Sequence, residues 1–200
     1  MRRLVLGSAS PRRVALLREL SVAFEVRPAA IDETQRAGES PDAFARRMAR
    51  EKGTAVARTT DGAWVLSADT IVVVDDVVLG KPVDAADALR MLRRLSNRSH
   101  AVLTAVALTS GECLQDELLV RSAVEFRALT DAEIAAYVAG GEPFDKAGAY
   151  AIQGGAAGFV RRVAGSYTNV VGLPVDEVGA LLDRHGIPCV RAAGAAVRRP

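Results

Sequence analysis

The segment Trp64–Val74 constrains the fold most, because it is a run of mainly apolar residues with one carboxylate, Asp69, inside it. Such a run is typical of a buried strand. The acidic pair Asp75-Asp76 follows, and then Val77–Leu79, which predicts a hairpin. A carboxylate inside a buried strand is costly unless it is paired, hydrogen-bonded or bound to a cation. The chain is therefore expected to contain a sheet whose interior holds a charge that needs a partner.

Capping signals and apolar patterns predict the other elements. Helices are expected to begin at Ser10-Pro11, Ser40-Pro41, Asp84, the capping box Thr130/Glu133 and Pro174, and to end near 20, 58, 95, 138 and 186. Further strands are expected at Leu4–Leu6, 101–109 and 118–127, and a loop over most of 140–158. Alternating helices and strands followed by hairpins predict an α/β fold with a mixed sheet.

The chain length of 200 residues suits one domain, or two small lobes around one cleft. We expect a folded domain over 1–189 and a disordered tail over 190–200, where no apolar periodicity is present. No run of about 18 apolar residues occurs, so no membrane span is expected. The apolar stretch near Met1 is too short for a signal peptide, which makes the cytoplasm the expected location.

Charge and metal-ligand content exclude several classes of function. The 26 basic and 24 acidic residues give a net charge of +2, which does not favour a nucleic-acid surface but suits a small anion held by local cations. Two distant cysteines, Cys113 and Cys189, and two histidines, His100 and His185, give neither a disulfide framework nor a zinc site. A metal would depend on carboxylates, which favours Mg²⁺ or Mn²⁺.

Arg12 and Arg13 lie in the first turn of the helix expected after Ser10-Pro11. A positive charge there opposes the helix dipole by about 0.3–1 kcal/mol. The free N–H groups of the same turn attract anions. Two arginines beside them, after a strand and a Ser/Gly loop, predict a phosphate site. The alternative is that both arginines extend into solvent.

Lys52 falls inside the apolar stripe of the helix expected over 41–58. With Phe44 at zero and about 100° per residue, Lys52 lies at about 80°, between Met48 at about 40° and Val56 at about 120°. The other charges of this segment lie between about 200° and 340°. A buried ammonium needs a partner, so Lys52 is a candidate site residue. The alternative is a lysine whose charged end reaches the edge of the stripe.

Four other residues are candidates of unequal strength. Asp69 is suited to act as a general base, or it is a strand-end aspartate paired structurally with an arginine. Lys81 lies between a glycine and a proline, which fix the backbone and aim one cation, although a turn lysine usually faces solvent. Glu33 is a weaker candidate in an acidic loop. Gln153 has an amide that can read a base edge, although a loop glutamine often reads nothing.

Six blocks of the sequence, in family order and spanning residues 4 to about 185, together resemble the Maf family of nucleoside triphosphate pyrophosphatases. The blocks are Leu-Gly-Ser-Ala-Ser-Pro-Arg-Arg (6–13), Arg-Glu-Lys (50–52), Ser-Ala-Asp-Thr (67–70), Gly-Lys-Pro (80–82), Asp-Lys-Ala-Gly-Ala-Tyr-Ala-Ile-Gln-Gly (145–154) and Val-Gly-Leu-Pro (171–174). Each block alone is a weak signal. One departure is Gly7, where alanine is commoner in the family.

The resemblance implies a Maf-type fold, related to the inosine triphosphate pyrophosphatases, with the site in a cleft between two lobes. It implies these catalytic residues: Asp69 as general base, with Glu33, Lys52 and Lys81. It implies these phosphate-binding residues: Arg13, Ser8 and Ser10. It also implies a divalent cation, Mg²⁺ or Mn²⁺, with Glu33 and Asp69 as its ligands.

Arg12, Thr70 and Gln153 match the family branch that resembles dTTP/UTP pyrophosphatases, and not the branch similar to 7-methyl-GTP pyrophosphatases. The expected activity is hydrolysis of dTTP, UTP or modified pyrimidine triphosphates to a monophosphate and pyrophosphate. Two alternatives stay open: a nucleotide-binding regulator of septum formation without turnover, and a house-cleaning hydrolase for altered purine triphosphates. A nucleoside triphosphate is the expected partner, and a homodimer is one assembly open to the chain.

Overall fold

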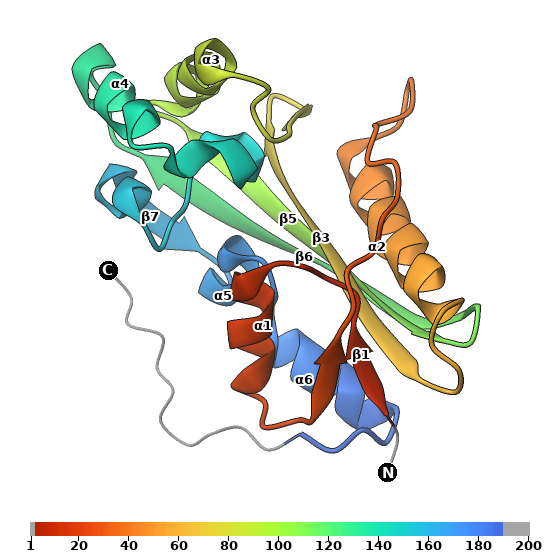
Figure 1. The fold of residues 1–200 in the computed structure, drawn as a ribbon. Coiled ribbons are helices and arrows are strands. Elements are labelled where there is room, and N and C mark those ends of the chain that lie inside the picture. The colour runs from red at the N-terminus through yellow and green to blue at the C-terminus, as the bar shows by residue number, and fades with distance from the viewer. Residues whose placement is uncertain (1–2, 190–200) are drawn as a thin grey trace.

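The computed structural model describes residues 3–189, and the predicted tail at 190–200 lies outside them, so the domain limit at 189 stays a prediction. Within 3–189 there is one seven-stranded mixed sheet in the order β2-β1-β3-β5-β6-β7, with β4 paired to β3 (Figure 1). Only β1 pairs in parallel, with β2 and β3. The strands are β1 (Leu4–Leu6), β2 (Phe24–Val26), β3 (Trp64–Val74), β4 (Val77–Leu79), β5 (Ser99–Ser110), β6 (Cys113–Phe126) and β7 (Val160–Ala164).

The helices begin where the capping signals place them. They are α1 (Pro11–Arg18), α2 (Pro41–Ala57), α3 (Ala85–Leu95), α4 (Asp131–Ala139), α5 (Tyr167–Val171) and α6 (Val175–Arg184), with short 3₁₀ helices at Glu142–Asp145, Ala147–Ala149 and Gly155–Phe159. Ser10, Ser40 and Asp84 cap their helices, and Thr130 and Glu133 form the predicted capping box. The prediction of α/β secondary structure with a mixed sheet is therefore confirmed. Within residues 3–189, every helix is too short or too polar to cross a membrane.

Several element limits differ from the sequence predictions. Helix α1 ends at Arg18, two residues early. Strand β5 is longer at both ends than expected, and β6 begins five residues early and ends one residue early. The stretch 140–158 is not mostly loop, because three 3₁₀ turns occupy much of it. Strands β2 and β7 and helix α5 were not predicted, since the first two are short outer strands with exposed residues and the third has five residues.

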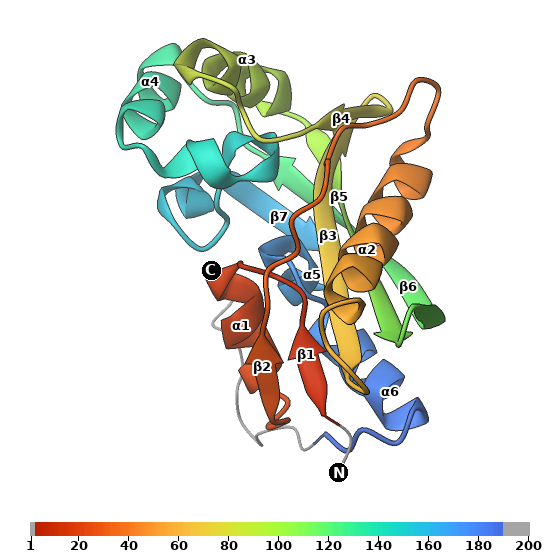
Figure 2. The ribbon, with the colours of Figure 1, turned by 45° about the vertical axis from the view of Figure 1, so that its right-hand side comes forward.

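The sheet separates two layers, and residues alternate between them along each strand. Helix α2 covers one face, where its apolar stripe packs on Ile71 and Val73 of β3 and on Leu103 of β5. The larger core lies on the other face, where Leu66 and Val72 of β3 pack with residues of α1, α3, α4 and α6. Figure 2 shows α2 on one side of β3 and α1 on the other. Odd-numbered residues of β3 therefore face α2, and even-numbered residues face the larger core.

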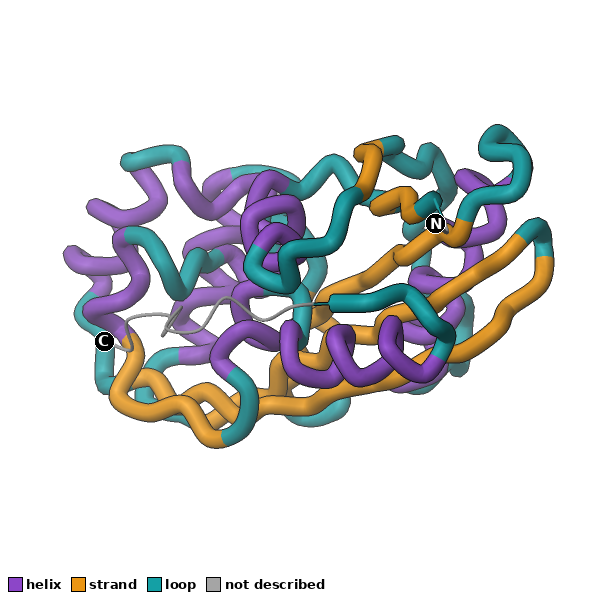
Figure 3. The backbone as a smooth tube through the Cα atoms, turned by 90° about the horizontal axis from the view of Figure 1, so that it is seen from below, coloured by secondary structure: helices purple, strands orange, loops and turns teal. Residues whose placement is uncertain are grey.

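One edge of β3 has a gap in its pairing. Strand β1 pairs with residues 64–66, and β4 pairs with residues 72–74. No described strand covers 67–71 on that edge, while β5 continues to pair with them on the other edge. The gap lies between two groups of helices, α1 with α6 towards one end of the sheet and α3 with α4 towards the other (Figure 1). The long strands cross the molecule between these ends (Figure 3).

Candidate active site

A cavity of about 570 Å³ opens at the gap beside residues 67–71. All ten residues singled out in the sequence line it: Ser8, Ser10, Arg12, Arg13, Glu33, Lys52, Asp69, Thr70, Lys81 and Gln153. They come from the β1–α1 loop, α1, the loop before α2, α2 itself, β3, the turn after β4, and the segment after the second 3₁₀ helix. A cavity is thus present as the resemblance implies, and the chain brings the candidate residues to it from segments far apart in sequence.

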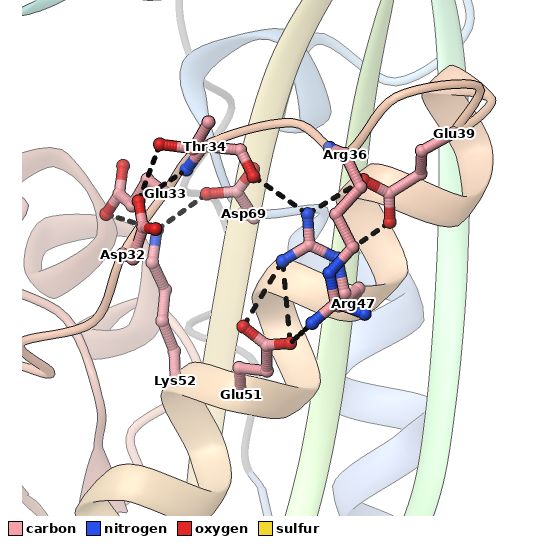
Figure 4. A network of polar contacts seen from close by, with 9 residues as sticks. All are labelled: Asp32, Glu33, Thr34, Arg36, Glu39, Arg47, Glu51, Lys52 and Asp69. Atoms are coloured by element: carbon pink, nitrogen blue, oxygen red, sulfur yellow. Dashed lines mark hydrogen bonds and ion pairs between the residues drawn. The ribbon is translucent and has the colours of Figure 1, made fainter.

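Lys52 and Asp69 form a buried ion pair at this cavity. The Lys52 ammonium donates to Asp69 Oδ1 over 2.7 Å and lies 2.8 Å from Glu33 Oε1, so one cation bridges two carboxylates (Figure 4). The side chains of Lys52 and Asp69 are only 9% and 11% exposed. The helical-wheel prediction that Lys52 is buried and paired is confirmed, and Asp69 is paired with a lysine and not with an arginine.

Close contact between α2 and β3 brings Lys52 to this pair. A Cβ added to Gly53 would lie 2.8 Å from Ser67 Oγ and 2.7 Å from Thr109 Oγ1, closer than real Cβ atoms come. Ser67 also donates a hydrogen bond to the carbonyl of Ala49 over 2.7 Å, which ties the helix to the strand. The glycine after Lys52 is therefore needed because helix and sheet are in contact at that turn.

Glu33 lies at the mouth of the cavity, about half-exposed, with Lys81 Nζ 3.7 Å from its Oε2. Burial acts to raise its pKa, but the hydrogen bond and charge of Lys52, with the charges of Lys81 and Arg13, outweigh burial and hold the pKa below its usual value. Glu33 is therefore a carboxylate at neutral pH. The structure brings Glu33, Lys52, Asp69 and Lys81 together as one charged group.

Arg13 lies on the opposite face of β3 from Asp69. Its guanidinium donates to the Gly172 carbonyl over 2.9 Å, to Ser8 Oγ over 3.3 Å and to Thr70 Oγ1 over 3.0 Å. Burial lowers the pKa of the Arg13 guanidinium, and the charge of Asp69 partly offsets that effect. These bonds fix the plane of the guanidinium at the cavity, beside the N-terminal turn of α1.

The remaining predicted residues surround these two groups. Ser10 caps α1 by accepting from the backbone N–H of Arg13 over 3.4 Å, which leaves its role in ligand binding a prediction. Ser8 is buried, while Gln153 is exposed at the rim of the cavity. Arg12 lines the cavity from the first turn of α1. The residues predicted to contact phosphate and those predicted to contact the base thus line the same cavity, and their roles stay predictions.

The carboxylates at the cavity suit a hard divalent cation that also binds substrate and water better than they suit a metal enclosed entirely by protein ligands. Within residues 3–189, no group of three or more His, Cys, Asp or Glu side chains is placed to hold a metal. Glu33 and Asp69 supply two carboxylates that share Lys52 at an open cavity. Mg²⁺ is commonly held by one or two carboxylates together with substrate phosphates and water, so this pair suits such an ion.

Three residues with titratable side chains that line the cavity were not singled out from the sequence: Asp145, Lys146 and Tyr150. The Lys146 ammonium is mostly buried and pairs with Asp145. That hydrogen bond, with the more distant charge of Arg12, lowers the pKa of Asp145 although burial acts against it. Adjacent opposite charges in a glycine-rich stretch look like a solvated pair, which is why they gave no signal. The signal that could have identified the Asp145–Lys146 pair is its position at the start of the 145–154 block.

The comparisons with known proteins agree with this geometry. Residues 3–185 match a family model described as Maf-like protein. A protein of Geobacter sulfurreducens named dTTP/UTP pyrophosphatase is 54% identical over 187 residues, which are 92% of this chain and 97% of that protein. A protein of Myxococcus xanthus with the same name is 53% identical over 185 residues, with 92% and 93% covered. A HAM1 protein from Coxiella burnetii has the same fold, with a TM-score of 0.53, 18% identity, and coverage of 92% of this chain and 100% of that chain. The chain belongs to the family of Maf-like proteins.

Proposed function

We propose that the protein hydrolyses pyrimidine nucleoside triphosphates, dTTP and UTP, to a nucleoside monophosphate and pyrophosphate. The observation that carries the proposal is the buried Asp69–Lys52 pair at a cavity lined by an excess of cations over carboxylates. A protein that only binds nucleotide has no need of a buried carboxylate beside the phosphate site. The names of relatives more than 50% identical support the same reaction and substrates.

In the proposed reaction, Asp69 accepts a proton from water while the water oxygen attacks a phosphorus. A new P–O bond forms, the anhydride bond between the α- and β-phosphates breaks, and its electrons leave with pyrophosphate. Lys52 orients the Asp69 carboxylate through the bond of 2.7 Å. Arg13, Lys81 and Lys52 stabilise the charge that develops on the phosphate oxygens, which is where most catalysis of phosphoryl transfer arises.

A Mg²⁺ or Mn²⁺ ion held by Glu33 and Asp69 with phosphate oxygens would neutralise part of the triphosphate charge. Base choice is assigned to Gln153, whose amide offers a donor and an acceptor to the O4 and N3–H edge shared by uracil and thymine. Arg12 would form the neighbouring wall of that part of the cavity. The cytoplasmic location and a homodimeric assembly stay predictions of the sequence.

The test is product analysis across a panel of pyrimidine and purine triphosphates with Mg²⁺ or Mn²⁺. We expect pyrophosphate as the first product, with dTTP and UTP preferred over dCTP, CTP and GTP.

Asp69→Asn should lower turnover by about 10²-fold or more while the protein still folds. The matched control is Asp61→Asn, which removes an exposed carboxylate from the turn before β3. Orthophosphate as first product, or wild-type turnover in Asp69→Asn, would overturn the mechanism, and equal rates on GTP and dTTP would overturn the substrate class.

A further inference from the structure

The turn that carries Gln153, residues 151–154, is held from outside the cavity by two side chains. The N–H of Gly154 donates to the carbonyl of Ala151 over 3.0 Å, which places Gln153 at a corner of this turn, exposed at the rim of the cavity. Helix α4 supplies Tyr137, and the 3₁₀ helix that follows it supplies Glu142. We propose that Tyr137 and Glu142 are positioning residues that fix this turn and so aim the Gln153 amide at the base. This inference rests on the proposed function, in which Gln153 reads the base.

Both sides of the Gln153 turn have a backbone N–H bound by one of these side chains. The N–H of Ala151 donates to the Tyr137 hydroxyl over 3.0 Å, and the N–H of Gly155 donates to Glu142 Oε2 over 3.0 Å. Burial raises the pKa of Tyr137, and hydrogen bonding and charge from the nearby Glu142 carboxylate add to that effect and outweigh the bond from Ala151. The hydroxyl therefore keeps its proton at neutral pH, and the Ala151 N–H meets its lone pairs.

The fold fixes Tyr137 and Glu142 in their turn. The Tyr137 ring lies edge-on to the ring of Phe159, with 5.3 Å between their centroids. Gly141 has a φ of 78°, a left-handed conformation that reverses the chain after α4 and brings Glu142 back towards the Gln153 turn. The two acceptors that hold the turn therefore have fixed positions. A binding group keeps its geometry only when the residues around it hold it in this way.

Close packing behind Gln153 supports the same role for Glu142. A Cβ added to Gly154 would overlap the Glu142 carboxylate, and one added to Gly155 would lie 3.1 Å from the Tyr137 ring. An alanine at position 154 would therefore have to displace the carboxylate from the Gly155 N–H. The absence of a side chain at Gly154 is what lets Glu142 reach across the turn.

Neither Tyr137 nor Glu142 is among the residues that line the cavity, so both would act on a nucleotide through the Gln153 turn. Hydrogen bonds weaken steeply when donor and acceptor are misaligned, so a displaced turn would spoil what the amide reads. Cytosine carries a donor where thymine and uracil carry the O4 acceptor. The preference for dTTP over dCTP therefore reports whether the amide is held in place. The affinity for inorganic tripolyphosphate, which has no base, reports on the phosphate contacts alone.

The test measures kcat/KM for dTTP and dCTP with Mg²⁺, and the affinity of the full-length protein for tripolyphosphate by calorimetry. Tyr137→Phe removes only the hydroxyl and should lower kcat/KM for dTTP by about 3- to 10-fold, the scale of one lost hydrogen bond. The dTTP/dCTP ratio should fall by a similar factor, while tripolyphosphate affinity stays at the wild-type value. Glu142→Ala should have at least the same effect. Glu142→Gln, which keeps an acceptor for the Gly155 N–H, should retain most of the preference.

Matched substitutions separate positioning from a general effect on the fold. Tyr167→Phe removes a tyrosine hydroxyl away from the cavity lining and should leave both quantities unchanged. Gly154→Ala should act like Glu142→Ala, because the added Cβ displaces the carboxylate. Gly158→Ala is its control, since a Cβ there would meet open space, and it should act like wild type.

A Gln153→Ala background tests whether the effect passes through the amide. Tyr137→Phe on that background should cause no additional fall in the dTTP/dCTP ratio, because the group that it positions is absent. Melting temperatures show that each variant compared is folded, and Tyr137→Phe, which keeps the ring, serves where Glu142→Ala is not.

An unchanged dTTP/dCTP ratio in folded Tyr137→Phe would overturn the proposal. An equal fall on the Gln153→Ala background, or a loss of tripolyphosphate affinity as large as the loss in kcat/KM, would overturn it as well. Failure of the proposed function gives a different result, namely a wild-type protein that releases no pyrophosphate from dTTP. The two failures are therefore distinguishable, because one is observed in the wild type and the other only in the variants.

Discussion

At the scale of single residues, Lys52 has the most demanding position in the molecule. Its ammonium is almost fully buried, and it pairs with both Asp69 and Glu33. A charge taken out of water is tolerated only when its partners are close and well oriented, as the distances of 2.7 and 2.8 Å show here. We therefore expect both stability and activity to depend on this one side chain.

Lys52→Met is expected to leave the buried Asp69 carboxylate without its cation. The free energy of unfolding should fall by about 3 kcal/mol, the lower end for breaking a buried pair, because Glu33 is half-exposed and stays solvated. The double variant Lys52→Met/Asp69→Asn should recover much of that stability and remain inactive. Denaturant unfolding with a turnover assay measures both quantities. Stability equal to wild type in Lys52→Met would show that the pair contributes nothing to folding.

Gln153→Glu is expected to lower turnover of dTTP and UTP much more than it lowers stability. The residue is exposed in a turn at the rim of the cavity, so its replacement disturbs no packing. A carboxylate cannot donate to the base carbonyl, and each lost bond costs about 1–3 kcal/mol. Gln115→Glu on exposed β6 adds the same charge outside the cavity and should change neither kinetics nor melting temperature. An unaltered nucleotide preference in Gln153→Glu would contradict the assignment.

The sequence could identify Lys52 and Asp69 because each places a charge within a regular apolar pattern. It could not identify the contacts of Arg13, since they depend on Thr70 of β3 and on the Gly172 carbonyl, which lie far from Arg13 in the sequence. The Asp145–Lys146 pair escaped because adjacent opposite charges look like a solvated pair, and only the fold shows that they line the cavity. Contacts between distant segments decide such roles, and local patterns do not contain them.

At the scale of elements, the segment between β2 and α2 presents Glu33 and depends on one arginine of α2. Arg47 Nε and Nη2 each lie 2.7 Å from an oxygen of Glu39, Nη1 lies 3.3 Å from Glu51 Oε2, and Nη2 donates to the Thr34 carbonyl over 3.0 Å (Figure 4). The hydrogen bond from Arg47 lowers the pKa of Glu39 to about 2. Glu39, which anchors Arg47, therefore stays ionised at pH values well below the usual pKa of a glutamate.

Arg47→Met is expected to loosen residues 32–39 and, with them, the position of Glu33. Turnover should fall by about tenfold, the scale of a misplaced group, while the sheet and α2 remain folded. Limited proteolysis should show faster cleavage within 32–39. Arg58→Met is the control, because its pair with Glu112 is exposed on both sides and such pairs contribute little. Full activity together with unchanged proteolysis in Arg47→Met would contradict this view of the segment.

Strand β3 and helix α2 could be predicted to the residue or nearly so, whereas β2, β7 and α5 could not. The first two are long, apolar on the faces that they bury, and bounded by capping or turn residues. Strand β2 has one half-buried and two exposed residues, and β7 is half-buried at most. Outer strands of this kind form because a neighbouring strand pairs with them. Their own sequences contain no periodicity that predicts a strand.

At the scale of the whole molecule, the core contains a histidine that makes stability depend on pH. His100 is buried, lies edge-on to Phe126, and its Nε2 is 2.8 Å from the hydroxyl of Tyr150. Burial lowers the pKa of His100 from 6.5 to about 4. Between these two values the unfolded chain binds a proton that the folded chain does not, so stability rises with pH.

The free energy of unfolding should therefore fall as pH is lowered from 6.5 to 4, by about 3 kcal/mol from His100 alone. Denaturant titrations at pH 7 and pH 4.5 measure the change. His100→Leu should be less stable at pH 7, because it loses the bond to Tyr150, but should show a smaller loss between the two pH values. An equal pH dependence in both proteins would mean that carboxylates, and not this histidine, cause the acid sensitivity.

The gap along β3 allows the two faces of a single strand to contribute different groups to one cavity. Neighbouring residues face different layers, so the proposed catalytic pair of Asp69 and Lys52 lies on the α2 side and the Arg13 guanidinium, proposed to bind phosphate, lies on the other. A continuous sheet would isolate these layers from each other, whereas here one ligand can touch both. Mutations on the Arg13 side can then change how phosphate is bound while the Asp69–Lys52 pair stays intact. Related proteins can therefore differ in how they hold a substrate while they keep the same catalytic pair.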